Sequence, residues 1–190
     1  MDVTLKLEFD ERDFIKACIA RERWAQRKLY EDFYGPLMGL CLRYANNQED
    51  AMDILHDGYI KIFRHISRYQ PGTSLIAWMR RIMVNTAIDY YRKKTRRRTE
   101  DLEAAQGVAS TDAGVVSNLS TEEILNCIQS LSPAYRSVFN LYVIEGYSHK
   151  EIGELLNITE STSRSNLVKA RIKLREMLAV LNGVYDQQGV

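Results

Sequence analysis

The stretch "YSHKEIGELLNITESTSRSNLVKARIKLREML", residues 147–178, predicts two helices separated by a short break. Ser148 can cap the first helix with its hydroxyl. One face of that helix carries the apolar residues Ile152, Leu155 and Leu156. Asn157 suits a tight turn because it tolerates left-handed backbone angles, and Thr159 or Ser161 can then cap the second helix. This length and spacing are typical of a helix-turn-helix.

The second helix of this stretch has an inner face and a polar outer face. Helical spacing places four residues on the inner face, Ser163, Leu167, Ala170 and Leu174. The residues that point away or flank that face are Ser161, Thr162, Arg164, Ser165, Val168 and Lys169. Short side chains let a helix approach the major groove closely, and Arg can pair with guanine. Plain helical hairpins with solvated polar faces show the same spacing, so this pattern alone leaves both interpretations open.

Charge is distributed unevenly along the chain. Lys and Arg number 26 and Asp and Glu 25, so net charge by itself does not indicate a polyanionic partner. The run "RKKTRRR" at 92–98 is strongly basic, whereas residues 99–123 contain no Lys or Arg. Residues 99–119 are rich in Ala, Gly, Val, Ser and Asp without a helical period, which is typical of a linker.

The rest of the sequence predicts helices only. Apolar residues recur at helical spacing from Phe14 to Arg92, and strand-like alternation is absent. Pro71-Gly72 indicates a loop, with Thr73 or Ser74 as the cap of the following helix. "STEE" at 120–123 has the form of a capping box. The predicted fold class is all-α, with a helical domain over 10–98, a linker over 99–119 and a second helical domain over 120–181.

Several functional classes lack support in the sequence. Cys18, Cys41 and Cys127 match no metal-ligand spacing and are expected to be small apolar residues in a reducing compartment. The three histidines, His56, His65 and His149, also form no metal-ligand motif. No signal peptide or membrane-spanning run is recognisable, so no membrane insertion and a cytoplasmic location are expected. Neither a cofactor nor enzymatic activity is predicted.

Two longer blocks resemble a known family. The segment "LSPAYRSVFNLYVIEGYSHKEIGELLNITESTSRSNLVKARIKLREML", residues 131–178, closely resembles region four of bacterial sigma factors of the extracytoplasmic-function (ECF) group. The segments "DAMDILHDGYIKIFRHI", 50–66, and "LIAWMRRIMVNTAIDYYRKKTRR", 75–97, resemble region two of the same family. The two blocks stand in the family's order on either side of the linker. This combination is far more specific than a lone helix-turn-helix.

The resemblance implies a promoter-specificity subunit that recruits core RNA polymerase and helps to open promoter DNA. Region four would contact the minus-thirty-five element through His149, Lys150, Ser161, Thr162, Arg164, Ser165, Lys169 and Arg171. Region two would contact the melted minus-ten element through Tyr69, Arg80, Arg81, Ile82, Asn85, Arg92, Lys93 and Lys94. Polymerase would be bound by Asp50, Asp53, Ile54, His56, Asp57 and Ile60.

Within these sets the resemblance assigns different tasks. His149, Lys150 and Arg171 are expected on phosphates, and Tyr69, Ile82 and Asn85 in a pocket for a flipped base. The loop "RYQPGTS", 68–74, is expected to set base preference. The acidic linker would thread through the polymerase, and an anti-sigma partner could cover both polymerase-binding faces.

Some positions depart from the family pattern. Ser163 stands where region four usually has valine, and Leu75 where region two usually has phenylalanine. Met52 and His56 stand where Glu and Gln are common. Because Ser163 lies on the predicted inner face, its hydroxyl is expected to bond back to a backbone carbonyl.

Other interpretations remain open from the residues alone. Asn85 could make a structural hydrogen bond, Trp78 could pack in the core, and the acidic face over 50–63 could simply be solvated. A helical sensor domain joined to a helix-turn-helix would give an operator-binding transcription regulator, which explains 131–178 but not the block around Asn85. A recombinase or nuclease is disfavoured, because no catalytic arrangement of carboxylates, His, Ser or Tyr is recognisable.

Overall fold

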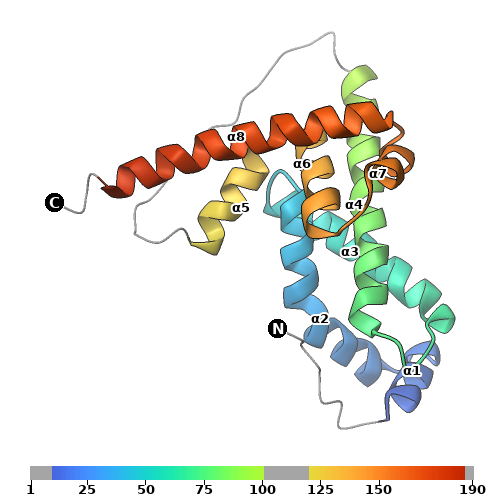
Figure 1. The fold of residues 1–190 in the computed structure, drawn as a ribbon. Coiled ribbons are helices and arrows are strands. Elements are labelled where there is room, and N and C mark those ends of the chain that lie inside the picture. Colours follow the sequence, from blue (N-terminus) through green and yellow to red (C-terminus); the bar gives the residue numbers. More distant parts are fainter. Residues whose placement is uncertain (1–9, 101–119, 187–190) are drawn as a thin grey trace. The chain divides into compact units, whose positions relative to one another are not determined.

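The computed structural model describes residues 10–100 and 120–186, with side chains described over 10–93 and 120–181. Within these ranges all regular elements are helices, which confirms the all-α prediction (Figure 1). The predicted linker lies almost wholly outside the described residues. The first helices are α1 (Glu11–Ile19), α2 (Arg23–Tyr44), α3 (Gln48–His65), η1 (Ile66–Arg68) and α4 (Leu75–Glu100). The later ones are α5 (Thr121–Ser130), α6 (Pro133–Phe139), η2 (Asn140–Ile144), α7 (His149–Leu156) and α8 (Glu160–Asp186).

The chain folds as two compact units. The first contains α1, α2 up to Cys41, α3 from Glu49 and α4 up to Thr86. The second contains the segment 42–48, the remainder of α4 and helices α5 to α8. The boundaries of these units differ from those of the two predicted domains, because the long helices α2 and α4 continue from one unit into the other.

The core of the first unit is built from one face of each helix. Its largest fully buried side chains are Phe14, Leu29, Leu37, Leu40, Ile54, Leu55, Ile62, Met79, Met83 and Val84. Helices α3 and α4 approach closely at Gly58, where an added Cβ would lie 2.3 Å from Sδ of Met83. Cys18 and Cys41 are buried and form no disulfide, as expected for small apolar residues. Because the inner face of α4 is buried in this core, its opposite face lies at the surface and is accessible to a binding partner.

The turn before α4 has the chemistry that the sequence predicts. Ser74 is the residue that caps α4, because its Oγ accepts a hydrogen bond from the Ala77 backbone amide at 3.3 Å. Gly72 has a φ of +93°, in the left-handed region that glycine adopts without steric cost. The Pro71-Gly72 loop signal therefore marks a real chain reversal between η1 and α4.

The second unit contains the predicted helix-turn-helix in α7 and α8. Ser148 caps α7 in a reciprocal capping box with Glu151. Asn157 ends α7 with a φ of 55° and a ψ of 49°, which confirms it as the left-handed turn residue. Thr159 begins the second helix, because its Oγ1 accepts a hydrogen bond from the Thr162 amide at 3.0 Å. The helix-turn-helix is thus specified locally at both helix starts and at the turn.

Helix α8 packs along α5, α6 and α7 (Figure 1). Part of its inner face joins the cluster of Cys127, Ile128, Leu131, Ala170 and Leu174. Partly buried residues extend this cluster, namely Tyr135, Phe139, Met177, Leu178 and Leu181. Nearer its start, α8 buries Ser163 and Leu167. All four residues of the predicted inner face are therefore buried.

Gly153 makes a testable contribution to the helix-turn-helix. A Cβ at this position would lie 2.9 Å from the Ile158 backbone carbonyl oxygen, which cannot move without distorting the turn. We expect Gly153→Ala to lower the free energy of unfolding by about 1–3 kcal/mol in urea titrations. Gly39→Ala is the matched control, because a Cβ added to Gly39, inside α2, would meet no atom within 4 Å beyond its chain neighbours and the adjacent backbone of its own helix. The control should be neutral or slightly stabilising, and equal destabilisation of both variants would contradict the steric argument.

Candidate nucleic-acid and polymerase interfaces

The outer face of α8 presents the polar side chains that the sequence placed there. Ser161, Thr162, Arg164, Ser165 and Lys169 are all exposed, and Val168 is exposed beside them. This arrangement follows directly from burial of Ser163, Leu167 and Ala170 on the opposite side. The start of α8 therefore presents a surface of small, hydrogen-bonding side chains, which suits close approach to the major groove.

Arg164 is held by an acidic neighbour on the same helix. Its guanidinium lies 2.5 Å from Oε1 of Glu160, one turn earlier, and both side chains are largely exposed. Exposed pairs of this kind contribute little to stability and exchange readily with water. Glu160 therefore competes for the guanidinium with any base or phosphate that approaches this end of α8.

His149 and Ser163 form a buried polar pair between the two helices of the motif. Nδ1 of His149 lies 2.9 Å from Oγ of Ser163, and their side chains are 8% and 0% exposed, respectively. The Tyr142 ring stacks on the imidazole, with a centroid distance of 4.4 Å and an interplanar angle of 20°. The expected bond from Ser163 to a backbone carbonyl is replaced by this contact. Ser163 therefore joins α8 to the first turn of α7.

The surroundings of His149 disfavour its charged form. Burial lowers the pKa of the imidazole from its usual value, and the positive charges of Arg164 and Arg171 lower it further. Glu160 opposes this effect. Because His149 is buried and one ring nitrogen already faces Ser163, its surroundings differ from those expected of a phosphate contact. The structure favours a neutral imidazole that supports the helix-turn-helix from inside.

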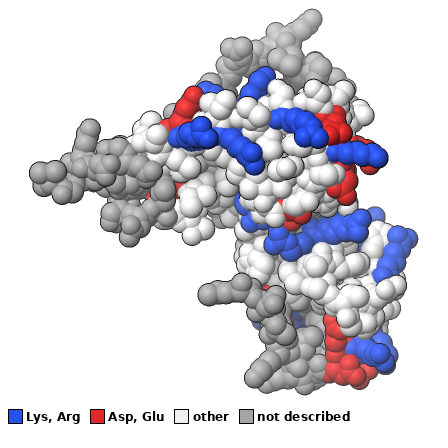
Figure 2. Space-filling view, viewed as in Figure 1, with Lys and Arg blue, Asp and Glu red and all other residues white. Residues whose placement is uncertain are grey.

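Basic side chains follow α8 beyond its first turns (Figure 2). Lys169, Arg171, Lys173 and Arg175 are exposed, and Lys150 is exposed on α7. The Arg171 guanidinium lies 6.0 Å from the centroid of the Tyr142 ring, close enough for a cation–π contact. These side chains supply positive charge beside the small polar surface at the start of α8.

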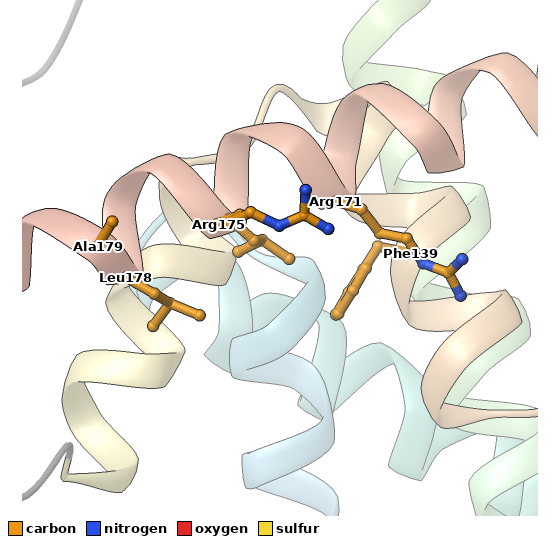
Figure 3. A pocket seen from close by; sticks show the side chains of 6 residues that line it. Phe139, Arg171, Arg175, Leu178 and Ala179 are labelled. Atoms are coloured by element: carbon orange, nitrogen blue, oxygen red, sulfur yellow. The ribbon is translucent and has the colours of Figure 1, made fainter. Parts of the chain in front are cut away.

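An open apolar hollow lies along the same helix. It has a volume of about 480 Å³ and is lined by Phe139, Arg171, Leu174, Arg175, Leu178 and Ala179 (Figure 3). Its walls offer hydrocarbon and guanidinium groups but no carboxylate, imidazole or thiol. The hollow therefore lacks the groups that acid–base catalysis or metal binding would need.

A second candidate surface lies on α4, opposite its buried face. Asn85 and Arg81 are exposed, and Trp78 and Ile82 are partly buried beside them. Trp78, Ile82 and Asn85 are spaced at i, i+4 and i+7, so they share one side of the helix. The exposed amide of Asn85 can donate to and accept from a base edge, while Trp78 and Ile82 supply apolar surface.

The basic residues expected near this surface occupy different environments. Arg92 and Lys93 are exposed on α4, and Arg80 is partly buried. The side chain of Lys94 lies outside the described residues. The described cations extend the polar side of α4 toward its C-terminal half.

Tyr69 does not lie open to solvent as a free wall of this surface. Its side chain is 4% exposed, and its ring packs against Trp78 with a centroid distance of 5.7 Å. The hydroxyl lies 2.7 Å from Oε1 of Glu11 on α1. Tyr69 therefore supports the loop 68–74 from its buried side. Its placement differs from that expected of a residue that packs directly on a base.

Helix α3 presents an acidic and apolar stripe on its outer side. Asp53, His56, Asp57 and Ile60 are exposed at i, i+3, i+4 and i+7, and Asp50 is partly buried near the start of the same side. Ile54 is a correction to the predicted set, because it is 1% exposed and packs in the core. Its buried side chain instead holds α3 in position against the core. Ile60, at 55% exposure, is the aliphatic residue that this surface offers to a partner.

Metal-binding clusters and membrane-spanning helices are absent from the part of the chain that the structure describes. Its residues contain no group of three or more His, Cys, Asp or Glu side chains arranged to hold a metal ion. None of the described helices has the length and apolar character needed to cross a membrane. Cys127, like the other two cysteines, is buried and forms no disulfide.

The fold places this chain among all-helical proteins that carry a helix-turn-helix. Residues 29–97 match the family described as Sigma-70 region 2, and residues 121–174 match the family described as Sigma-70, region 4. These matches fall on α2 to α4 and on α5 to α8, the helices that carry the surfaces described above.

Characterised relatives agree with these matches. The RNA polymerase sigma factor CarQ of Myxococcus xanthus is 30% identical, over 85% of this chain and 95% of its own length. The ECF RNA polymerase sigma factor SigW of Bacillus subtilis is 32% identical, over 73% and 81%. The ECF RNA polymerase sigma factor SigE of Mycolicibacterium smegmatis is 35% identical over 74% of this chain, which spans 56% of that longer protein. The chain belongs to the sigma-70 family of RNA polymerase sigma factors, in its ECF group.

A solved structure supports the fold independently. The sigma factor RpoE of Bartonella quintana, in its complex with the anti-sigma factor NepR, aligns with a TM-score of 0.53. The sequence identity is 19%, and the alignment covers 81% of this chain and 96% of that one. At this identity the likeness concerns the arrangement of helices.

The neutral state of His149 predicts a pH dependence. Because its folded pKa lies below the unfolded value of about 6.5, the unfolded chain binds more protons between these two values. Stability of the second unit should therefore rise with pH through that window and fall as the solution is acidified through it. Replacing His149 with Phe, which keeps an aromatic ring against Tyr142, should flatten this part of the profile.

Urea titrations at pH 5, 6 and 7 would measure the effect. His56→Phe is the control, because His56 is exposed on α3. Its profile should follow that of the wild type. An unchanged slope for His149→Phe would contradict a neutral, buried imidazole.

Proposed function

We propose that this sigma factor directs core RNA polymerase to promoters through three separate surfaces and performs no covalent chemistry. The outer face of α8 reads the minus-thirty-five element, the polar side of α4 with the loop 68–74 holds the melted minus-ten element, and the α3 stripe docks on polymerase. The observation that carries this proposal is that each surface lies opposite a buried helix face. A partner can therefore be bound without opening the core.

The α8 surface supports sequence reading by its composition. Ser161, Thr162 and Ser165 are small and exposed, so the helix axis can approach base edges closely. Arg164 and Lys169 add reach and charge. Lys150 and Arg171 are exposed at the margin of this surface, where contacts with phosphate would fix its orientation on the duplex.

The α4 surface supports capture of an unpaired base. Exposed Asn85 lies beside Ile82 and Trp78, which combines an amide with apolar surface. Extrusion of a base from the stack costs roughly a few kcal/mol, and such contacts offset that cost. Arg80, Arg81, Arg92 and Lys93 lie along the same helix and would attract the DNA backbone. Lys94 belongs to this proposed set by its place in the sequence.

The α3 stripe supports docking on a basic protein surface. Asp53 and Asp57 are one turn apart, with His56 between them and Ile60 one further turn along. Such a mixture of charge and apolar area gives a contact both orientation and burial. Asp50 extends the acidic side. Ile54 contributes to this surface only by fixing the helix, since its side chain is buried.

Each of the two domains has its own part in the proposed function. Domains over 10–98 and 120–181 would each carry one DNA surface, and the acidic segment 99–119 would link them through the polymerase. The protein would act in the cytoplasm, where polymerase and promoter DNA meet. An anti-sigma factor is an expected partner, since the sigma factor RpoE of Bartonella quintana forms a complex with the anti-sigma factor NepR. Its simplest mode of action is to cover the α3 stripe and part of the second domain.

Transcription with purified core polymerase and a library of genomic fragments tests this function. The expected result is initiation from templates that share an upstream and a minus-ten element. Asp57→Arg should abolish transcripts and co-elution with core polymerase, because it reverses charge at the centre of the α3 stripe. Glu31→Arg, an exposed acid on α2, should leave both unchanged. Specific operator binding without any association with polymerase would instead support a conventional transcription regulator.

The pairing of Glu160 with Arg164 makes a second, quantitative prediction. If Arg164 makes a bidentate base contact, Arg164→Ala should weaken binding of the holoenzyme to its upstream element by about 1–3 kcal/mol. Glu160→Gln should strengthen binding, because it removes the carboxylate that competes for the guanidinium. Mobility-shift titrations on matched and mutated upstream elements measure both changes. Equal loss for Arg164→Ala on every sequence would show a phosphate contact.

A further inference from the structure

Glu11 connects the first helix to a loop about sixty residues away in sequence. Its Oε2 accepts a hydrogen bond from the Gly72 backbone amide at 2.8 Å. Its Oε1 lies 2.7 Å from the Tyr69 hydroxyl. One carboxylate therefore contacts the loop 68–74 at two points, one on the main chain and one on a side chain.

The loop that Glu11 holds is a tight, exposed turn. The Thr73 amide donates to the Gln70 carbonyl at 3.3 Å, and the Thr73 hydroxyl donates to the same oxygen at 2.8 Å. Pro71 and Gly72 occupy the two central positions, and the φ of +93° at Gly72 fits a type II turn. Gln70, Pro71, Gly72, Thr73 and Ser74 are all exposed. The turn is thus exposed to solvent, while the Gly72 amide at its centre and the Tyr69 hydroxyl before it are both bonded to Glu11 on α1.

Tyr69 links the turn to α4 as well as to Glu11. Burial, together with the bond to Glu11, raises the pKa of its phenol to about 12, so the hydroxyl stays protonated at neutral pH. The ring contacts Trp78 on the side of α4 that also holds Ile82 and Asn85. The Tyr69 hydroxyl also lies 2.5 Å from the Thr73 carbonyl oxygen. Its single proton can therefore serve either of two acceptors.

We infer that Glu11 is a positioning residue for minus-ten recognition: before DNA arrives, its carboxylate fixes the 68–74 turn, which packs through Tyr69 against Trp78 on the side of α4 that carries Asn85. This inference rests on the proposed function and identifies a residue outside the three segments that carry the family resemblance. Glu11 is positioned for this task by α1, whose Phe14, Ile15 and Cys18 are buried in the core of the first unit. The carboxylate is thereby held by a rigid element.

The physical benefit is preorganisation. An exposed turn that carries glycine has many accessible conformations, and ordering it at the moment of base capture would weaken binding. Glu11 orders the turn in the free protein through a main-chain contact that does not depend on the loop's own side chains. The identities of Gln70 and Thr73 could then affect base preference while the path of the backbone stays constant.

The two hydrogen bonds of Glu11, to Gly72 and to Tyr69, respond differently to conservative and to disruptive substitutions. Glu11→Ala removes both contacts. Glu11→Gln can retain both, because the amide oxygen accepts from Gly72 while the amide group donates to the Tyr69 oxygen and the phenol proton turns to Thr73. Tyr69→Phe removes one contact and keeps the ring against Trp78. Asp13→Ala is the matched control, because Asp13 is an exposed acid in the first turn of the same helix and pairs with Lys16.

The experiment measures open-complex formation by the holoenzyme on a cognate promoter and on promoters with single minus-ten substitutions. Glu11→Ala removes both hydrogen bonds to the carboxylate, so we expect it to slow opening at least about tenfold on the cognate promoter and to reduce discrimination among minus-ten sequences. Affinity for core polymerase and discrimination among upstream elements should stay at wild-type values. Glu11→Gln should restore opening, and Tyr69→Phe should give an intermediate loss.

The inference is overturned if Glu11→Ala matches Asp13→Ala in both rate and discrimination. It is also overturned if Glu11→Ala lowers core affinity and opening together while discrimination is kept, because that pattern indicates general destabilisation. Should Glu11→Ala fail to fold, unchanged discrimination in Tyr69→Phe and in Glu11→Asp, whose shorter side chain cannot reach both partners, would overturn it equally. A wild-type protein that initiates at no promoter would refute the proposed function itself, which separates the two failures.

Discussion

Burial of one side of each long helix is the constraint on which the rest of this protein depends. In α8, Ser163, Leu167, Ala170 and Leu174 face inward, so the helical period fixes which side chains face outward. The same logic applies to α4, whose inner residues include Met79 and Met83. A helix of this kind cannot change its outer surface by rotating without exposing its core. The recognition surfaces are therefore as rigid as the cores that support them.

Buried polar contacts add precision to this apolar framework. The His149–Ser163 pair joins the two helices of the helix-turn-helix at a position where an apolar residue would only fill space. A hydrogen bond in the interior has directional requirements, so it restricts the rotation and register of α8 relative to α7. The Glu11 contacts act similarly at the surface of the first unit, where they restrain a turn that has little apolar anchoring of its own.

Much of this architecture is predictable from sequence because it is specified locally. The turn at Asn157, the cap at Ser148 and the outward face of α8 depend on residues within a few helical turns of one another. The contact between His149 and Ser163 could not be deduced in this way. A serine at a predicted core position signals that a buried polar partner is needed, but its pairing with His149, which is expected on a phosphate from the sequence, depends on how α7 crosses α8. Longer-range features were less accessible still. Ile54 was predicted as a polymerase contact because it lies within a family-like acidic segment, whereas packing against neighbouring helices places it in the core. Tyr69 is expected at a base from the sequence, whereas in the structure it is buried and its hydroxyl bonds a carboxylate fifty-eight positions earlier in the chain. That contact arises only when the fold brings α1 beside η1.

Selection of promoters as a subunit of RNA polymerase is the role from which the other proposals follow. Footprinting of a cognate promoter, with the protein alone and with the protein bound to core polymerase, is the decisive test of that role. We expect protection of the upstream element and reactivity of unpaired minus-ten bases only when core polymerase is present. Full, sequence-specific protection by the protein alone, unchanged by core polymerase and without unpaired bases, would contradict it.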